Sequence, residues 1–147
     1  MKKLILTTIA GLMALQLTAL ADEAWHTDFA KAQAEARKGN KLILMDFMGS
    51  DWCGPCIRLK KEVFDSKEFT DYATKNLVLL EVDFPRSRKQ SPELAKANVA
   101  LQKKYNVDGF PTIVILNGEG KEVLRSVGYT PGGPKPWIAK LDGVKKK

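Results

Sequence analysis

The chain has 147 residues, a length typical of one domain, with 44% hydrophobic and 28% charged residues as in ordinary globular proteins. Its net charge is +7, but the basic residues are dispersed and no aromatic platform lies among them, which argues against a nucleic-acid-binding face. The 2 cysteines are too few for the disulfide framework of a small secreted domain.

The first 21 residues resemble a secretory signal peptide. A basic start, MKK, is followed by an uncharged apolar run and by Ala19-Leu20-Ala21, which has small residues where a signal peptidase reads them. We expect cleavage after Ala21, so that residues 1–21 are a signal peptide and residues 22–147 form the mature domain. The alternative is an uncleaved membrane anchor, because the run is at the lower length limit for a spanning helix. Export to the periplasm or beyond would place the cysteines where disulfides persist.

Hydrophobic periodicity predicts helices that alternate with buried strands. The first helix is expected over 28–38, with Thr27 or Asp28 as its N-cap and Gly39-Asn40 at its end. Next come a buried strand over 42–47, a helical face of Ile57, Leu59, Val63 and Phe64, a helix from Asp65 or Ser66 to about Asn76, and a strand over 77–83. After a polar loop come a helix from Pro92 with the stripe Leu94, Ala97, Leu101 and Tyr105, a strand over 112–116, its hairpin partner over 121–127, and a helix from Pro136 or Trp137 to about Asp142.

This order of elements predicts an α/β domain. Helices that alternate with buried strands indicate a parallel sheet covered on both faces, and the terminal hairpin would add an antiparallel edge.

Cys53 and Cys56 are separated by two residues in the segment WCGPC (52–56), and four kinds of site use such a pair. Structural zinc needs about four Cys or His ligands, and the single histidine, His26, is far away, so two chains would have to share the metal. Covalent haem attachment needs a histidine after the second cysteine, where Ile57 stands. A structural disulfide would close too small a loop to stabilise much. A reversible dithiol–disulfide remains.

The local sequence favours a reactive pair. Both cysteines lie where a strand is followed by a turn and a helix, and the positive end of the helix dipole favours a thiolate at Cys53. Gly54 and Pro55 shape the turn, because proline suits the first turn of a helix, where its missing N–H costs no hydrogen bond. Cys56, one turn into the helix, should be the more buried of the two.

WCGPC resembles the active-site motif of the thioredoxin family, and other features match that family in the same order. They are the preceding strand with its acid, Asp46, and the segment DGFPT (108–112), which resembles the loop that carries a cis-proline opposite the active site. The resemblance covers residues 25–142 and implies a thioredoxin fold, with a central mixed β-sheet flanked by helices on both faces. GSDWC, EVDFP and GYTPGG are most similar to segments of exported thioredoxin-like disulfide reductases of the DsbH type.

The chain departs from the ordinary thioredoxin pattern in four places. Asp46 lies seven residues before Cys53, one more than usual, and Leu79 takes the place of the lysine that neighbours the buried acid. The helix after Cys56 lacks the usual kinking proline, and the loop over 84–92 is longer. These departures bear on the proton-transfer role of Asp46 and not on the dithiol chemistry.

The chemistry of the motif suggests roles for three residues. Cys53 would attack a substrate disulfide and form a mixed disulfide, which Cys56 would then resolve. Asp46 would accept the Cys56 proton through water, as a buried acid with a raised pKa. Its alternative role is that of a charge turned to solvent at the end of a strand.

The resemblance implies that three further residues shape the substrate site. Trp52 would pack beside the cysteines and shield them, although an ordinary exposed aromatic residue at a turn is the alternative. Phe110 and a cis Pro111 would expose backbone groups that pair with a substrate strand. We expect His26 to be a surface or packing residue.

These features predict an enzyme, a thiol–disulfide oxidoreductase that reduces the disulfides of secreted proteins. It needs no cofactor or metal, because the two sulfurs carry both electrons. An oxidising compartment will not reduce the Cys53–Cys56 disulfide back to the dithiol, so the reducing role implies a membrane electron donor of the DsbD type. We expect a monomer. The alternatives are a disulfide isomerase or oxidase, a redox-inert module that binds peptides near Phe110 and Pro111, and a metallochaperone.

Overall fold

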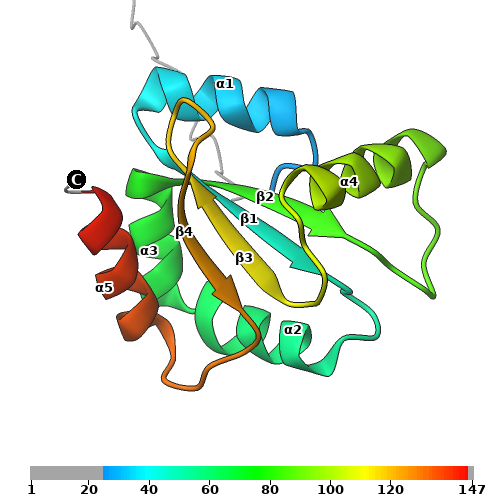
Figure 1. Cartoon of the computed structure of the whole chain (residues 1–147). Helices are drawn as coiled ribbons and strands as arrows, with labels where there is room; N and C mark the ends of the chain where they lie inside the picture. Colours follow the sequence, from blue (N-terminus) through cyan, green and yellow to red (C-terminus); the bar gives the residue numbers. More distant parts are fainter. Residues whose placement is uncertain (1–24, 146–147) are drawn as a thin grey trace, which may run out of the picture.

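The computed structural model describes residues 25–145, and the expected signal peptide lies outside them. In chain order the elements are α1 (Phe29–Gly39), β1 (Leu42–Met48), α2 (Gly54–Leu59), the π-helical segment η1 (Lys60–Phe64), α3 (Lys67–Asn76), β2 (Leu77–Asp83), α4 (Pro92–Lys104), β3 (Thr112–Leu116), β4 (Glu122–Val127) and α5 (Pro134–Lys145). They form an α/β domain around a central sheet (Figure 1). Among the described helices, none has the length and apolar character needed to cross a membrane.

Three helices begin at side chains that the sequence marks as N-caps. The Asp28 carboxylate accepts a bond from the Lys31 backbone N–H at 3.1 Å, and the hydroxyls of Ser66 and Ser91 do the same at the starts of α3 and α4. The bounds predicted for the last helix are wrong, because α5 runs from Pro134 to Lys145. A proline is tolerated anywhere in the first turn of a helix, so Pro136 did not have to mark its start.

The four strands within the described residues lie in the order β2-β1-β3-β4. β1 is parallel to β2 and antiparallel to β3, with Phe47 opposite Thr112, and the hairpin of β3 and β4 is antiparallel as well. The mixed sheet implied by the family resemblance is therefore confirmed. The largely parallel sheet expected from the alternation of elements is wrong, because β3 enters beside β1 in the opposite direction, and alternation does not specify direction.

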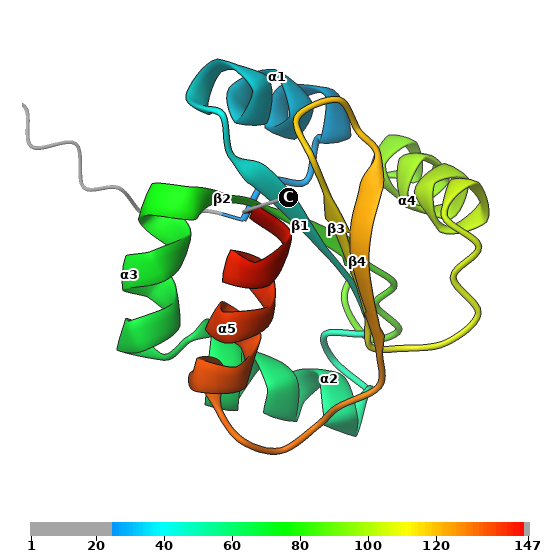
Figure 2. The same cartoon turned by 60° about the vertical axis from the view of Figure 1, so that its left-hand side comes forward.

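Helices cover both faces of the sheet, with α1 and α4 on one face and α2, α3 and α5 on the other (Figures 1 and 2). Side chains along a strand alternate between the two faces. Ile43, Met45 and Phe47 pack with α1 and α4, whereas Leu42 and Leu44 pack with the other three helices. By the same alternation, Asp46 points toward the face that α2 covers.

The helix that follows the cysteines changes its geometry at η1. The Asp65 backbone N–H donates to the Lys60 carbonyl at 2.8 Å, which closes a π-turn. A π-turn is one of the recognised causes of a helix bend, so this segment can bend where the usual proline is missing. η1 also buries Val63 and Phe64 in the core.

Candidate active site

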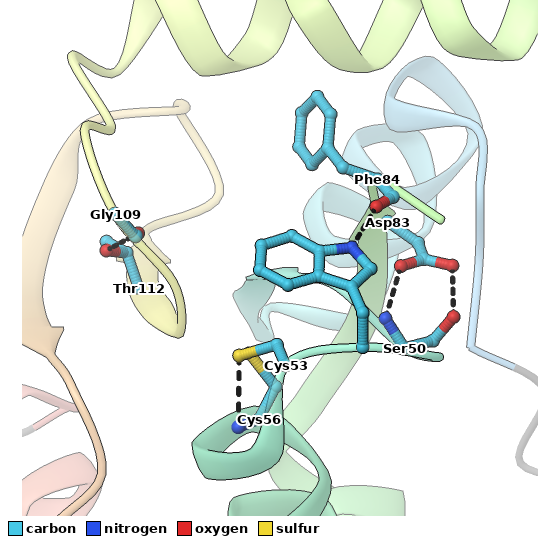
Figure 3. Close-up of a disulfide and its surroundings, with 8 residues drawn as sticks. Ser50, Cys53, Cys56, Asp83, Phe84, Gly109 and Thr112 are labelled. Atoms are coloured by element: carbon cyan, nitrogen blue, oxygen red, sulfur yellow. Dashed lines mark hydrogen bonds between the residues drawn. A yellow bond between two sulfur atoms is a disulfide. The ribbon is translucent and has the colours of Figure 1, made fainter. Parts of the chain in front are cut away.

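Cys53 and Cys56 form a disulfide at the start of α2, with their Cα atoms 5.3 Å apart (Figure 3). Cys53 is the N-cap of the helix, and its Sγ accepts a bond from the Cys56 backbone N–H at 3.3 Å. Gly54 and Pro55 follow as the first two helical residues. Cys53 is 5% exposed and Cys56 is 1% exposed, so Cys56 is the more deeply buried of the two, as its place one turn into the helix predicts.

Asp46, on the strand that leads to the motif, is buried rather than turned to solvent. Its side chain is 2% exposed, and its Oδ1 has no hydrogen-bond partner among the described residues. Burial raises its pKa to about 8, and the negative charges of Glu81 and Asp83 add to this shift while Lys60 opposes it. Glu81 lies directly opposite Asp46 on β2. An acid of this kind changes its protonation near neutral pH, as a general base must.

A pocket of about 370 Å³ lies beside Cys56. It connects the inner cysteine with Glu81 and Lys60, and its full lining is Met48, Ser50, Cys56, Ile57, Lys60, Lys61, Asp65 and Glu81. Leu79, at the position of the usual lysine, is buried in the core instead. The positive charge that acts on Asp46 therefore comes from Lys60, after α2, and not from β2.

Three aromatic side chains gather beside the disulfide. The Trp52 ring meets Phe110 edge to face at 6.0 Å between centroids, and Phe110 stacks on Phe84 at 5.1 Å. Phe110 also packs against the buried cluster of Met48, Cys53 and Cys56. Trp52 is 37% exposed and its indole N–H donates to the Phe84 carbonyl at 2.7 Å, so it is a fixed part of the surface around the cysteines.

The loop before β3 lies opposite the disulfide (Figure 3). Its Phe110–Pro111 peptide bond is cis, as the family resemblance implies. Thr112 Oγ1 donates to the Gly109 carbonyl at 2.7 Å, and Gly128 N–H donates to the Pro111 carbonyl at 2.8 Å. The sheet thus brings residues 108–112 next to a motif that is far away in sequence.

Sequence reasoning missed the contacts of Asp51 with the loop after β2. Its carboxylate accepts backbone N–H bonds from Arg86, Ser87 and Arg88, at distances from 2.6 to 3.2 Å. These bonds, with that of Arg86 the largest contribution, hold the pKa of Asp51 below its usual range. The residue two positions before Cys53 therefore ties this loop to the active site.

Asp83 ties the same loop from the other side. Its carboxylate, 1% exposed, accepts bonds from the backbone N–H and the hydroxyl of Ser50 at 2.8 and 2.6 Å (Figure 3). The Arg88 guanidinium pairs with both Asp83 and Glu81. A run of basic residues after an acidic strand end was the available signal, but charge alone did not show which groups would pair.

His26 lies away from this site. It forms a bridge with Leu80 at the edge of β2, and its Nε2 lies 2.9 Å from a Glu35 carboxylate oxygen. These contacts are those of a surface or packing residue, as expected for His26. Within residues 25–145, no three His, Cys, Asp or Glu side chains are grouped in a way that could hold a metal ion.

Residues 29–141 match the family model of the thioredoxin-like domain. The chain belongs to this family. The disulfide bond reductase DsbH of Chlamydia pneumoniae is 35% identical over 128 residues, which cover 87% of this chain and 76% of that protein. The thiol:disulfide interchange protein DsbD of Pasteurella multocida is 29% identical over 137 residues, but the match covers only 22% of that protein. A solved DsbH oxidoreductase superposes with a TM-score of 0.78 at 34% identity, and the match covers 84% of each chain.

This thioredoxin-like domain therefore gathers the residues that the sequence singled out. Trp52, Gly54 and Pro55 surround the cysteines on the turn and the first residues of α2. Phe110, joined to Pro111 by the cis bond, packs against their cluster from the loop before β3, and Asp46 lies on β1, paired with Ile113 of β3.

Proposed function

We propose that this chain is an exported thiol–disulfide oxidoreductase that reduces protein disulfides through Cys53 and Cys56. The observation that carries the proposal is the Cys53–Cys56 disulfide at the N-terminus of α2, with the outer sulfur accepting a backbone N–H bond. A helix N-terminus favours a thiolate at that position. The similarity to a disulfide bond reductase over most of the chain supports the reducing direction.

The reaction needs no electron carrier besides the two sulfurs. In the reduced protein, the Cys53 thiolate attacks one sulfur of a substrate disulfide, that S–S bond breaks, and the departing cysteine takes up a proton. The Cys56 thiolate then attacks Sγ of Cys53, releases the second substrate cysteine and restores the Cys53–Cys56 disulfide. Two electrons pass from the dithiol to the substrate, so each reaction leaves the protein oxidised.

Asp46 is the proposed base for the second step. Cys56 must lose its proton before it can attack, and Asp46 can hold that proton near neutral pH because burial raises its pKa to about 8. The pocket beside Cys56 leaves room for the water that would carry the proton. Glu81 and Lys60, which line this pocket, set the charge that Asp46 experiences.

Trp52, Phe110 and Pro111 are the proposed substrate contacts. Phe110 packs against the cluster that contains the two cysteines, and the Trp52 ring meets Phe110 edge to face. A substrate segment that lies along the loop over 108–112 would pair with its backbone, as in strand addition to an edge. This binding would hold the target disulfide against Cys53.

The proposed compartment and partners follow from the direction of electron flow. The basic and apolar start of the chain supports a signal peptide cut after Ala21, and thus the periplasm or secretion. In an oxidising space the Cys53–Cys56 pair has to be reduced again by a donor. We assign this step to a membrane protein of the DsbD type, and the substrates to disulfide-bearing secreted proteins. The protein would work as a monomer.

The first test is a trap for the mixed disulfide. Cys56→Ser leaves Cys53 able to attack but removes the resolving thiol, so a covalent adduct with a disulfide peptide should accumulate. Disulfide-reducing turnover should fall by roughly 10³-fold or more, as when other reacting groups are removed. The adduct is measured by mass spectrometry of the protein without reductant.

Cys53→Ser is the matched control and should form no adduct. An adduct on Cys56 in that variant would contradict the assigned order of attack. A double Cys53→Ser, Cys56→Ser variant that keeps the cellular activity would overturn catalysis and favour a redox-inert peptide-binding module.

A further inference from the structure

The five arginines of the described residues differ in their side-chain contacts. Four of them donate hydrogen bonds: Arg37 to Gly118, Arg58 to Glu62 and Tyr129, Arg88 to Glu81 and Asp83, and Arg125 to Glu122 and Tyr105. The Arg86 side chain donates none to any residue within 25–145. Instead, its guanidinium lies 3.8 Å from the centroid of the Trp52 ring, directly before Cys53 in the chain.

Arg86 is held in place from two sides. Its backbone N–H donates to the Asp51 carboxylate at 2.9 Å, and the two following residues donate to the same carboxylate. The ring beneath it is fixed as well, because the Trp52 indole N–H bonds to the Phe84 carbonyl. The guanidinium is therefore a preorganised cation at the rim of the active site, although the residue as a whole is exposed.

The acidic groups around Arg86 are already engaged. The Asp51 carboxylate is occupied by three backbone N–H groups, and Asp83 and Glu81 both pair with Arg88. Arg86 thus keeps its donors free for a group from outside. A guanidinium stacked on an aromatic ring still presents its N–H edge, whose geometry fits a carboxylate with two parallel hydrogen bonds.

We propose that Arg86 is a specificity-determining residue that binds an Asp or Glu side chain next to the target cysteine of a polypeptide substrate. The inference rests on the proposed function, because it needs a substrate disulfide positioned at Cys53. Trp52 supplies the apolar surface under the contact, and Arg86 supplies the charge that selects acidic segments. The contact acts on binding of the substrate and leaves the sulfur chemistry unchanged.

The test compares three disulfide peptides that differ only beside the cysteine, where they carry Glu, Gln or Lys. The reduced wild-type protein should reduce the Glu peptide about two- to fivefold faster than the Lys peptide, the range expected of one exposed ion pair. Arg86→Gln should abolish the preference, and Arg86→Glu should reverse it. High salt should weaken the wild-type preference.

Lys89→Glu is the matched control for Arg86→Glu, since it makes the same change of charge at another position on the same loop. It should keep the wild-type order of the three peptides. The inference is overturned if the wild type shows no preference, if Lys89→Glu reverses the preference as Arg86→Glu does, or if the Arg86 variants change all three rates by one common factor. That last result would mean that Arg86 acts on the thiolate. If the wild type reduces none of the peptides, the proposed function itself fails.

Discussion

At the scale of single residues, Asp46 shows how far the fold can change an acid. It stands on a strand whose seven residues are all buried, opposite Glu81 and near Asp83. Removal from water disfavours the charged form of a carboxyl group, and two nearby negative charges disfavour it further. Asp46 is therefore costly for stability whenever it is ionised, which is common for residues that serve catalysis.

This cost predicts a particular pH dependence of stability. The pKa of Asp46 is about 8 in the folded state against 3.8 for a free carboxyl, so the folded state binds its proton more tightly. The free energy of unfolding should be highest below the unfolded pKa and should decrease as pH rises toward 8, by up to about 1.4 kcal/mol per pH unit. Glu81, whose pKa is raised by burial and by Asp83, adds a slope of the same sign.

Asp46→Asn should flatten this slope and make the protein more stable than the wild type at pH 8. Urea denaturation of the oxidised proteins at several pH values measures the free energy of unfolding and its slope with pH. The control is Glu119→Gln, which removes an exposed carboxyl and should leave the wild-type slope. If the free energies of unfolding of Asp46→Asn and of the wild type decrease equally as pH rises toward 8, the burial of an ionisable Asp46 does not cause the slope.

The position of the two cysteines at a helix start could be predicted from the sequence, whereas the hydrogen-bond partners of Asp51 could not. Cys53 stands at a helix start, which is a local property of WCGPC and is the feature that favours a thiolate. The role of Asp51 depends on where the chain runs 35 residues later, because it binds the backbone of Arg86. Local pattern cannot specify a contact of that kind.

At the scale of elements, the loop between β2 and α4 is held by hydrogen bonds to groups outside it. The Asp51 carboxylate accepts bonds from three of its backbone N–H groups, and the Asp83 backbone carbonyl at the end of β2 accepts a bond from the side chain of Gln90 in the loop. A loop that is bonded in this way presents the same surface to every substrate, which reduces the ordering needed on binding.

Asp51→Ala should make the loop between β2 and α4 more mobile. The backbone N–H groups of 86–88 lose their acceptor, so their hydrogen exchange should become several-fold faster, while amides of the buried strand β1 keep their wild-type rates. Because the pKa of Asp51 is lowered, its carboxylate stays charged at a lower pH than that of an ordinary aspartate. Protection of 86–88 in the wild type should therefore be lost only at a more acidic pH than the one at which an ordinary aspartate takes up its proton. Unchanged exchange in the variant would contradict the anchoring role.

Element starts were predictable where a local signal sets them. Asp28, Ser66 and Ser91 cap their helices as their residue types suggest. The direction of β3 and the limits of α5 depend on packing against distant elements. The sequence-based predictions of both were wrong. The π-turn at η1 was also beyond reach, because no residue type marks a π-turn as proline marks a kink.

At the scale of the whole molecule, the sheet is what assembles the site. β1 leads to the cysteines and lies between β2, which leads to the loop with Arg86, and β3, which follows the loop with Phe110. Three segments that are separate in sequence thus meet at the same end of the sheet. The family resemblance implied two of these segments, and the structure adds the third.

The equilibrium reduction potential of the Cys53–Cys56 pair in the domain over 22–147 tests the proposed reducing role most directly. It can be followed in thiol–disulfide buffers, by mass spectrometry of the trapped thiols. A reductase requires a dithiol that gives up electrons readily, so we predict a value near about −270 mV, as in thioredoxin. A value between about −180 and −120 mV would contradict the reducing role and would make the protein an isomerase or an oxidase.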